Sequence, residues 1–373
     1  MYKRVSKDNR SCSKVILLGG WKLKIGLIVP ANTKISPYIQ YYISFFKEHQ
    51  LDYKVIVWNK KGGEDFADYT YDFQTTDEKR FHMLYGHAMF AQRCKRIIKK
   101  ESIDHLVIFT IAPLFFLGKR YLSRFEGRFI ADIRDDSPFR RRFADKLKQI
   151  GNMSFANVVS SPRYGLWLSE SLMCHNADKS ALLEAMNYTP KIKKELPVRI
   201  VFAGILIEPD RNIQILDELK NDSRFEFIFI GRENNGKKKV EQYVTQNEIS
   251  NVKFQGEYEK DQIVRIYRNE ADLVNIFRSK TEINADALPN KLYDAVMAGI
   301  PVIVFSHNKA ISEYVGKYNL GLVLEDKNNI SQDIITSLQS FDYDKYFSGR
   351  LSFLNLVLSD FEQFEVMLSD FTK

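Results

Sequence analysis

The sequence is poor in cysteine, and it has no apolar segment long enough to cross a bilayer. Cys12, Cys94 and Cys174 are widely spaced and odd in number, which argues against a disulfide framework and against a zinc site. The longest apolar run, 107–118, contains about a dozen residues, among them Pro113, whereas a membrane helix needs about 20. We therefore expect a cytoplasmic protein in a reducing compartment.

The motifs of several common enzyme classes are also missing. The sequence contains no P-loop, no Ser-His-Asp order and no cluster of metal-ligating residues, so we expect no metal cofactor. The first predicted strand, 24–30, leads into a loop at 31–37 that lacks the Gly-x-Gly-x-x-Gly fingerprint. This absence argues against a dinucleotide at this end of the chain.

What the sequence does contain is a repeated alternation of strand and helix patterns. The alternation starts at 24–30 and begins again with a strand at 197–204, as is typical of doubly wound parallel sheets. The length of 373 residues suits two such α/β domains. The predicted divisions are an extension at 1–22 that is disordered or not native, a first domain at 23–190, a second domain at 191–350 and an amphipathic helix at 351–373.

The two halves of the chain differ in net charge. Residues 1–195 carry +14 and residues 196–373 carry −6, of a total of +8. The first half is therefore expected to meet an anion, such as a membrane surface, a lipid pyrophosphate or nucleic acid, unless its charge serves solubility alone. The stretch 139–148 alternates cations with apolar residues, which suits an anionic membrane or a surface helix packed on the sheet. Without a recognition motif, we expect no nucleic-acid partner.

The densest functional signal lies in 286–304. Pro289 is a favoured residue at a helix start, and Gly299 fits the cap at its end. The free N–H groups and the dipole at the start of this helix favour an anion, and Lys291 adds a positive charge there.

Polar side chains gather around the same helix start. Asn290 and Asp294 are four residues apart and share one face, and Asp286 lies on the preceding loop. Phosphate-binding groups beside carboxylates for hydroxyls suit a sugar nucleotide. The alternative is that these residues only cap the helix and cover the surface.

This stretch resembles the signature of the retaining glycosyltransferases of family 4, which have the two-domain GT-B fold. The signature has two acidic residues separated by seven positions, followed by small residues, Gly, any residue, Pro and Val. The matching residues here are Asp286, Asp294, Gly299, Pro301 and Val302. The run 289–291 resembles a subgroup that often builds bacterial surface polysaccharides. Both acids are Asp here, where Glu is usual.

The resemblance extends to other parts of the second domain. Gly204 and Arg211 are seven residues apart, as are a Gly and a Lys in the family, and Ile205 stands where an Arg is common. The region that includes Gly256 lies near the nucleobase in the family. The implied donor-binding residues are Gly204, Arg211, Gly231, Gly256, Tyr258, Pro289, Asn290, Lys291 and Asp294. The helix at 351–373 is expected to pack back toward the first domain.

In the first domain, 132–138 follows a predicted strand and resembles the Arg-Asp-x-x-Pro segment of the same subgroup. Arg134 could neutralise phosphate, and Asp135 could orient or deprotonate an acceptor hydroxyl. The alternative is an Asp–Arg network that only fixes the loop. Asn32 and Ser36 are the candidates on the acceptor side. The candidate catalytic residues are Asp135, Arg134 and Asp286.

The sequence therefore predicts a glycosyltransferase that moves a hexosyl or N-acetylhexosaminyl group from a nucleotide sugar, with UDP-sugar favoured. The expected acceptor is a saccharide or a polyprenyl-pyrophosphate-linked sugar used in capsule or other surface polysaccharide synthesis. The enzyme is expected in the cytoplasm, with peripheral contact to the inner face of the plasma membrane through its basic half. Retention of configuration is implied by the resemblance alone. The competing hypotheses are a sugar-nucleotide 2-epimerase and an inactive GT-B partner of another glycosyltransferase.

Overall fold

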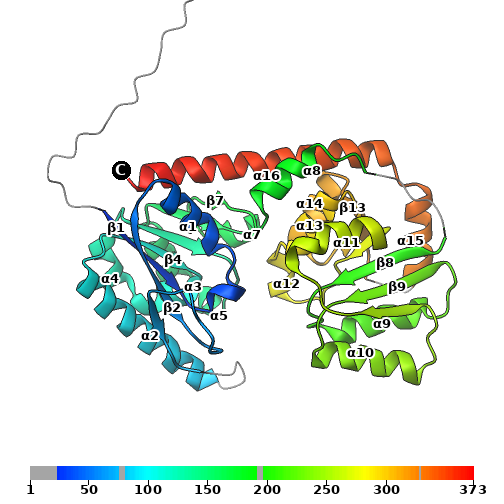
Figure 1. Cartoon of the computed structure of the whole chain (residues 1–373), viewed down its shortest axis with the longest axis horizontal. Coiled ribbons are helices and arrows are strands. Elements are labelled where there is room, and N and C mark those ends of the chain that lie inside the picture. Colours follow the sequence, from blue (N-terminus) through cyan, green and yellow to red (C-terminus); the bar gives the residue numbers. More distant parts are fainter. Residues whose placement is uncertain (1–22, 75–79, 191–195, 327–328) are drawn as a thin grey trace, which may run out of the picture.

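The computed structural model describes residues 23–74, 80–190, 196–326 and 329–373. The chain forms two domains, each built on a parallel sheet, and one long helix lies along both of them (Figure 1). This arrangement confirms the predicted α/β architecture. The extension expected at 1–22 lies outside the described residues.

The sheet of the first domain has the strand order β3-β2-β1-β4-β5-β6-β7, with all pairs parallel. Its strands are β1 (Lys24–Val29), β2 (Asp52–Trp58), β3 (Tyr69–Tyr71), β4 (His105–Phe109), β5 (Phe129–Ile133), β6 (Ala156–Val159) and β7 (Leu172–Met173). Its helices are η1 (Thr33–Ile35), α1 (Ile39–Glu48), α2 (Arg80–Glu101), α3 (Ile111–Leu117), α4 (Lys119–Leu122), η2 (Ser123–Phe125), α5 (Pro138–Arg142), α6 (Ala144–Gly151), α7 (Pro162–Gly165) and α8 (Lys179–Met186). The central strands β1, β4 and β5 are mostly apolar and almost wholly buried, as expected where helices cover both faces.

The second domain repeats this plan with the order β10-β9-β8-β11-β12-β13. Its strands are β8 (Val198–Ala203), β9 (Phe225–Ile230), β10 (Val252–Gln255), β11 (Leu273–Asn275), β12 (Val302–Phe305) and β13 (Gly321–Leu324). Its helices are α9 (Pro209–Leu219), α10 (Asn235–Gln246), η3 (Lys260–Gln262), α11 (Ile263–Glu270), α12 (Glu282–Asp286), α13 (Asn290–Ala298), α14 (Lys309–Lys317) and α15 (Ile330–Gln339). Neighbours β8 and β11 place the loops that follow them side by side at the carboxyl edge.

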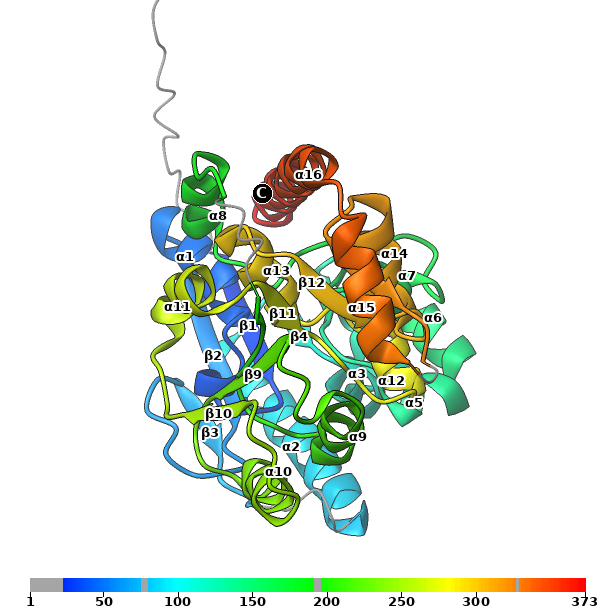
Figure 2. The same cartoon turned by 90° about the vertical axis from the view of Figure 1, so that its right-hand side faces the viewer.

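The last helix, α16 (Tyr343–Phe371), joins the two domains (Figures 1 and 2). Near its start, Arg350 donates hydrogen bonds to the carbonyl oxygens of Val296 (2.7 Å) and Ala185 (2.8 Å). Farther along, Phe364 packs edge-on against Tyr42 of the first domain, with ring centroids 5.1 Å apart. One apolar cluster therefore continues from the first sheet through α8, α13 and α16 to the second sheet.

One local expectation was wrong. The stretch 139–148 was expected to be one helix, but it divides into α5 and α6 at Phe143, whose φ is −132°. Tertiary contacts explain this break, because the rings of Phe139 and Phe143 both pack on Phe115, at 4.9 and 4.7 Å.

The packing of Phe139 and Phe143 also bears on the membrane hypothesis. Leu147, the third apolar residue of the stretch, is buried as well. The apolar side of α5 and α6 therefore faces the protein rather than a bilayer. Along the parts of the chain that the structure describes, we also find no helix with the length and apolarity needed to span a membrane.

Candidate active site

A cavity of about 170 Å³ lies at the carboxyl edge of the second sheet. It is lined by the ends of β8 and β11, by residues that follow these strands and by the start of α13. The lining includes Phe202, Glu208, Asn212, Asn275, Arg278, Pro289 and Lys291. Ligands of doubly wound sheets bind at this edge because the loops there diverge and leave a crevice. The cavity therefore stands where a nucleotide would be expected.

Lys291 lies in the first turn of α13 and points toward Gly204 and Phe202. A Cβ added to Gly204 would stand 3.6 Å from the ammonium nitrogen of Lys291. That nitrogen is 4.3 Å from the centroid of the Phe202 ring. Burial, with a contribution from Arg278, lowers the pKa of Lys291 to about 8. An anion in the cavity would favour the charged form of this lysine.

Asp294 and Tyr258 lie near Lys291. Burial raises the pKa of Asp294 to about 6, and Lys260 and Lys291 act against this rise. Burial and the nearby Asp294 raise the pKa of Tyr258 to about 12. The Tyr258 hydroxyl would stand 3.8 Å from a Cβ at Gly204. The structure thus brings Gly204, Tyr258, Lys291 and Asp294 together, and their role in donor binding stays a prediction.

The remaining predicted donor residues differ in position. A Cβ at Gly231 would stand 2.4 Å from the carbonyl oxygen of Gly204, so the ends of β8 and β9 can approach only with glycine there. Gly256 accepts a hydrogen bond from the Gly231 amide at 3.1 Å. Pro289 lines the cavity, whereas Asn290 is exposed at the first position of α13.

Arg211 is engaged away from the residues that line the cavity. Its guanidinium lies 4.1 Å from the centroid of the Phe305 ring and pairs with Asp326 at 2.8 Å. It also donates a hydrogen bond to Gln214 at 2.8 Å. These contacts bury Arg211 at the start of α9 and use its charge within the protein.

The acidic segment of the first domain, 132–138, contains a tight network of hydrogen bonds. Arg134 holds both oxygens of Asp132, at 2.5 and 2.7 Å, and donates to the carbonyl oxygen of Cys174 at 2.9 Å. Tyr42 donates a hydrogen bond to the same carboxylate at 2.7 Å. All of these groups are buried. Arg134 therefore fixes the loop after β5, which is the structural alternative considered from the sequence.

Asp135, the next residue, has a different environment. It is solvent-accessible, and no described residue forms a hydrogen bond or ion pair with its carboxylate. Surrounding protein raises its pKa, and the charges of Arg134 and Arg278 oppose that rise. Because Arg278 belongs to the second domain, Asp135 faces the cleft between the domains.

Asn32 and Ser36 are buried in the loop after β1. Asn32 donates to Asn59 at 2.6 Å and to the carbonyl oxygen of Gly62 at 3.1 Å. The Tyr38 hydroxyl donates to Ser36 at 3.3 Å. The polar groups of both residues are therefore engaged in hydrogen bonds within the first domain.

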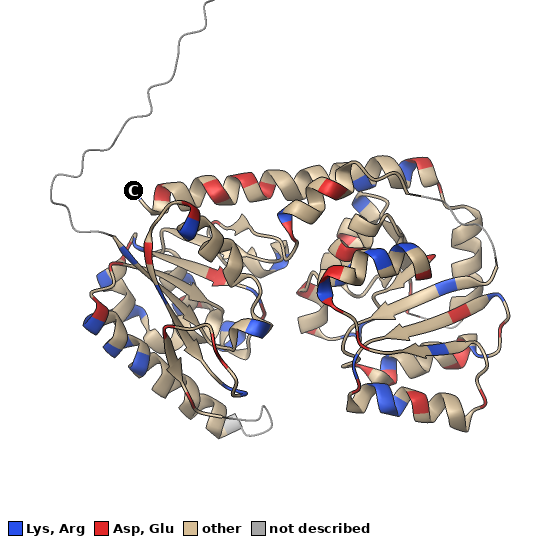
Figure 3. Cartoon of the chain, in the orientation of Figure 1, with Lys and Arg blue, Asp and Glu red and all other residues tan. Residues whose placement is uncertain are grey.

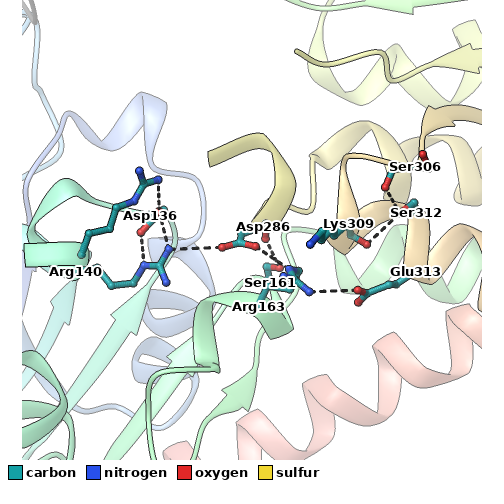
Figure 4. A network of polar contacts seen from close by, with 10 residues as sticks. Asp136, Arg140, Ser161, Arg163, Asp286, Ser306, Lys309, Ser312 and Glu313 are labelled. Carbon is teal, nitrogen blue, oxygen red and sulfur yellow. Dashed lines mark hydrogen bonds and ion pairs between the residues drawn. The ribbon is translucent and has the colours of Figure 1, made fainter. Parts of the chain in front are cut away.

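Asp286 lies in an ion-pair network that crosses between the domains (Figure 4). Arg163 of the first domain binds one oxygen of Asp286 at 2.7 Å, and Arg140 lies 3.5 Å from the other. Arg163 also reaches Glu313 at 3.2 Å, and a second pair joins Arg141 to Glu282. The basic α5 thus faces the acidic α12 (Figure 3), and Asp286 is not among the residues that line the cavity.

Two cavity residues were missed from the sequence. Glu208 accepts hydrogen bonds from the Asn284 side chain at 2.7 Å and from the Ser279 amide at 2.8 Å. Arg278 follows β11 by three residues. Its position just after a buried strand, at the edge where ligands bind, is the signal that could have identified it.

Two Rossmann-like domains whose carboxyl edges meet across a cleft define the GT-B fold. Residues 191–346 match the family model described as "Glycosyl transferases group 1". This match covers the domain that contains the cavity. No curated protein matches the chain.

Solved structures match over nearly the whole chain. A sucrose-phosphate synthase from Thermosynechococcus elongatus has a TM-score of 0.65 at 11% identity, covering 93% of this chain and 98% of its own. A glycosyltransferase from Rickettsia africae has a TM-score of 0.60 at 15% identity, covering 94% and 97%. A UDP-GlcNAc 2-epimerase from Neisseria meningitidis, bound to UDP-GlcNAc, has a TM-score of 0.58 at 13% identity, covering 93% and 100%. At these identities the similarity establishes the GT-B fold alone.

Proposed function

We propose that this protein is a glycosyltransferase that uses a nucleoside-diphosphate sugar, with a UDP-sugar favoured as donor. The observation that carries the proposal is the cluster of Lys291, Tyr258, Asp294 and Gly204 beside the cavity of the second domain. The match of that domain to glycosyl transferases group 1 supports the same class of reaction.

The chemistry of the donor site follows from charge. When the sugar leaves, negative charge develops on the diphosphate, and stabilising it is expected to be the main catalytic contribution. Lys291 and the N–H groups at the start of α13 supply that stabilisation from the protein itself. Asp294 is assigned to the ribose hydroxyls. In the described residues, no group of three or more His, Cys, Asp or Glu is arranged to hold a metal.

The acceptor is assigned to the first-domain side of the cleft. Asp135 is accessible and unpaired among the described residues, so its carboxylate can accept the proton of an acceptor hydroxyl. We assign Asp286 to the hydroxyls of the donor sugar. To bind them, its carboxylate must release the guanidinium of Arg163. We further propose a saccharide or polyprenyl-pyrophosphate-linked acceptor, retention of configuration and a role in surface polysaccharide synthesis.

The epimerase hypothesis has less support from the site. Such an enzyme would need a histidine and several carboxylates that face the sugar. His175 is buried between the Tyr293 hydroxyl at 2.8 Å and Asp360 at 2.7 Å. Glu208 is the one carboxylate among the residues that line the cavity, and both of its oxygens accept hydrogen bonds.

A thermal-shift panel tests the proposal first. UDP, GDP, ADP, CMP and their common sugar conjugates would each be added with and without EDTA. A ligand that binds only the native state raises the melting temperature by mass action, so we expect one nucleoside diphosphate to do so in the presence of EDTA. The matching nucleotide sugar should then release its nucleoside diphosphate when a polyprenyl-pyrophosphate saccharide is supplied, and the anomeric configuration of the product can be read by NMR.

The alternatives give different results in the same experiments. Conversion of the donor sugar to its 2-epimer without any acceptor would identify an epimerase. Nucleotide binding without turnover on any lipid-linked acceptor would support the inactive partner. No stabilisation by any nucleotide would contradict the glycosyltransferase.

A further inference from the structure

The guanidinium of Arg278 has no hydrogen bond or ion pair with any residue that the structure describes. It is half-buried. Arg163 and Arg211, in contrast, are engaged with Asp286 and Asp326 respectively. A partly desolvated cation without a partner carries an energetic penalty that a bound anion would offset. Arg278 is therefore available to a ligand.

The backbone at Arg278 is nevertheless well anchored. It follows β11, which is paired with β8 on one side and β12 on the other. The imidazole nitrogen Nε2 of His307 lies 2.9 Å from the carbonyl oxygen of Arg278. The side chain thus projects from a fixed point on the sheet edge, which makes it suitable for positioning a ligand.

Arg278 and Lys291 line the same cavity, and neither forms an ion pair with any residue that the structure describes. The one carboxylate among the residues that line the cavity, Glu208, accepts hydrogen bonds from Asn284 and Ser279 with its two oxygens. After burial, Arg278 is the largest influence that lowers the pKa of Lys291. Two positive charges are therefore held near one another in a cavity of about 170 Å³. This arrangement calls for a ligand with at least two negative charges.

Arg278 also faces the first domain. Its charge lowers the pKa of Asp135, against the larger effect of desolvation. Arg278 therefore lines the cavity that contains Lys291 and is also within electrostatic range of the carboxylate assigned to the acceptor. A group bound by Arg278 would lie at the point where donor and acceptor meet.

We propose that Arg278 binds the diphosphate of the donor together with Lys291 and stabilises it as the leaving group. This inference rests on the proposed function for the identity of the donor. In the transfer step, the acceptor oxygen forms a bond to the anomeric carbon, and its proton passes to Asp135. The bond between that carbon and the phosphate oxygen breaks, and its electron pair moves onto the diphosphate. The planar guanidinium offers paired N–H donors to the phosphate oxygens that receive this charge.

Isothermal titration calorimetry with UDP, uridine and inorganic pyrophosphate tests this role. The variants are Arg278→Gln, the conservative Arg278→Lys, and Arg265→Gln as a control. Arg265 is an exposed arginine of the same domain that does not line the cavity, so its variant loses the same charge elsewhere. Thermal unfolding of each variant establishes that the domain remains folded.

We expect Arg278→Gln to weaken UDP and pyrophosphate binding by about 10- to 100-fold, because charged hydrogen bonds to phosphate are lost. Uridine binding should be unchanged, and Arg278→Lys should recover part of the loss. The pH at which UDP binding declines should also rise in Arg278→Gln, because Lys291 then keeps its proton to higher pH. The selective loss of affinity for UDP and pyrophosphate, recovered in part by lysine, is the result that a purely structural arginine would not produce.

The outcomes separate this inference from the proposed function. If Arg278→Gln binds UDP and pyrophosphate as tightly as Arg265→Gln does, the role of Arg278 is overturned. The proposed glycosyltransferase activity is not affected by that result. Arg278-dependent binding of pyrophosphate, without binding of any nucleotide, would support the anion site and overturn the nucleotide-sugar donor. A wild-type protein that binds neither nucleotide nor pyrophosphate would overturn both.

Discussion

At the scale of single residues, the donor site holds ionisable groups in surroundings that disfavour their charges. Lys291 loses proton affinity through burial and the nearby Arg278, while Asp294 gains it through burial. In its charged form, neither group stabilises the folded protein. Such residues are expected where a ligand rather than the protein supplies the missing partner.

Lys291 makes nucleotide binding dependent on pH. Its pKa of about 8 in the free protein would rise when a diphosphate binds, so binding takes up a proton above this pH. We expect UDP affinity to fall between pH 7 and pH 9, approaching tenfold for each pH unit above 8. In Lys291→Met, binding should be weaker and nearly independent of pH. Calorimetry at several pH values measures the affinity. If UDP affinity fell equally steeply with pH in Lys291→Met, the lysine would not be the origin of the pH dependence.

Asp294 is expected to reduce the stability of the second domain at neutral pH. Because its pKa is raised to about 6, the folded state loses stability as the pH rises from about 4 through 6 and the carboxyl ionises. Asp294→Asn should therefore increase the free energy of unfolding by about 1–3 kcal/mol at pH 7. The gain should disappear near pH 4, and UDP binding should weaken. Denaturation at both pH values measures the effect, and an equal gain at pH 4 would contradict this origin.

At the scale of elements, the ion pairs between α7 and α12 hold the two domains together through Asp286. Arg163 is only partly exposed and contacts both Asp286 and Glu313. Removing it in Arg163→Gln should weaken domain closure by about 1–2 kcal/mol, between the values for exposed and buried pairs. Small-angle scattering should show a larger radius of gyration.

A matched control for Arg163→Gln lies within the second domain. Arg199 pairs with Asp272 at 3.0 Å, so Arg199→Gln breaks a similar pair without touching the interface. It should leave the radius of gyration unchanged. Salt should expand the wild type more than Arg163→Gln, since screening acts on the pair that the variant lacks. Identical dimensions for all three proteins at every salt concentration would show that the contact does not control closure.

The helix α16 should be needed for the stability of the first domain. Phe364 is buried against Tyr42, whereas Val366, two residues later, is 62% exposed. Phe364→Ala should cost about 3–5 kcal/mol, which is typical of a large core aromatic. Val366→Ala should have little effect. Chemical denaturation measures the free energy of unfolding of both variants. Equal values would mean that the contact of α16 does not stabilise the first domain.

Predictability from the sequence also differs between elements. The strands after 24 and 197 and the helix at 290–298 were predictable because their apolar runs and caps are local signals. The break at Phe143 was not, because it depends on Phe115, a contact far along the chain.

The cavity and its neighbours were predicted in part for the same reason. Lys291 and Asp294 belong to one short motif, so their common location could be inferred from spacing. The contacts of Asp286 with Arg163 depend on how two domains meet, which no local pattern encodes. Arg278 carries no motif, and its importance emerges only from the absence of a partner in the folded protein.

At the scale of the whole molecule, the two domains share one apolar cluster beside α16 and face each other through ion pairs on the cleft side. Apolar packing loses favourable energy steeply as surfaces separate, whereas charge pairs can exchange with salt or ligand. The α16 side is therefore the expected hinge, and the Asp286 side is the edge that opens.

The position of α16 in the chain has a consequence for biosynthesis. Phe364 is translated roughly 320 residues after Tyr42, the first-domain ring that it covers. At about 5–20 residues per second, the nascent first domain waits for tens of seconds with this aromatic surface uncovered. If translation stops before α16, the released protein has both sheets but exposes an apolar surface, to which chaperones or other chains can bind.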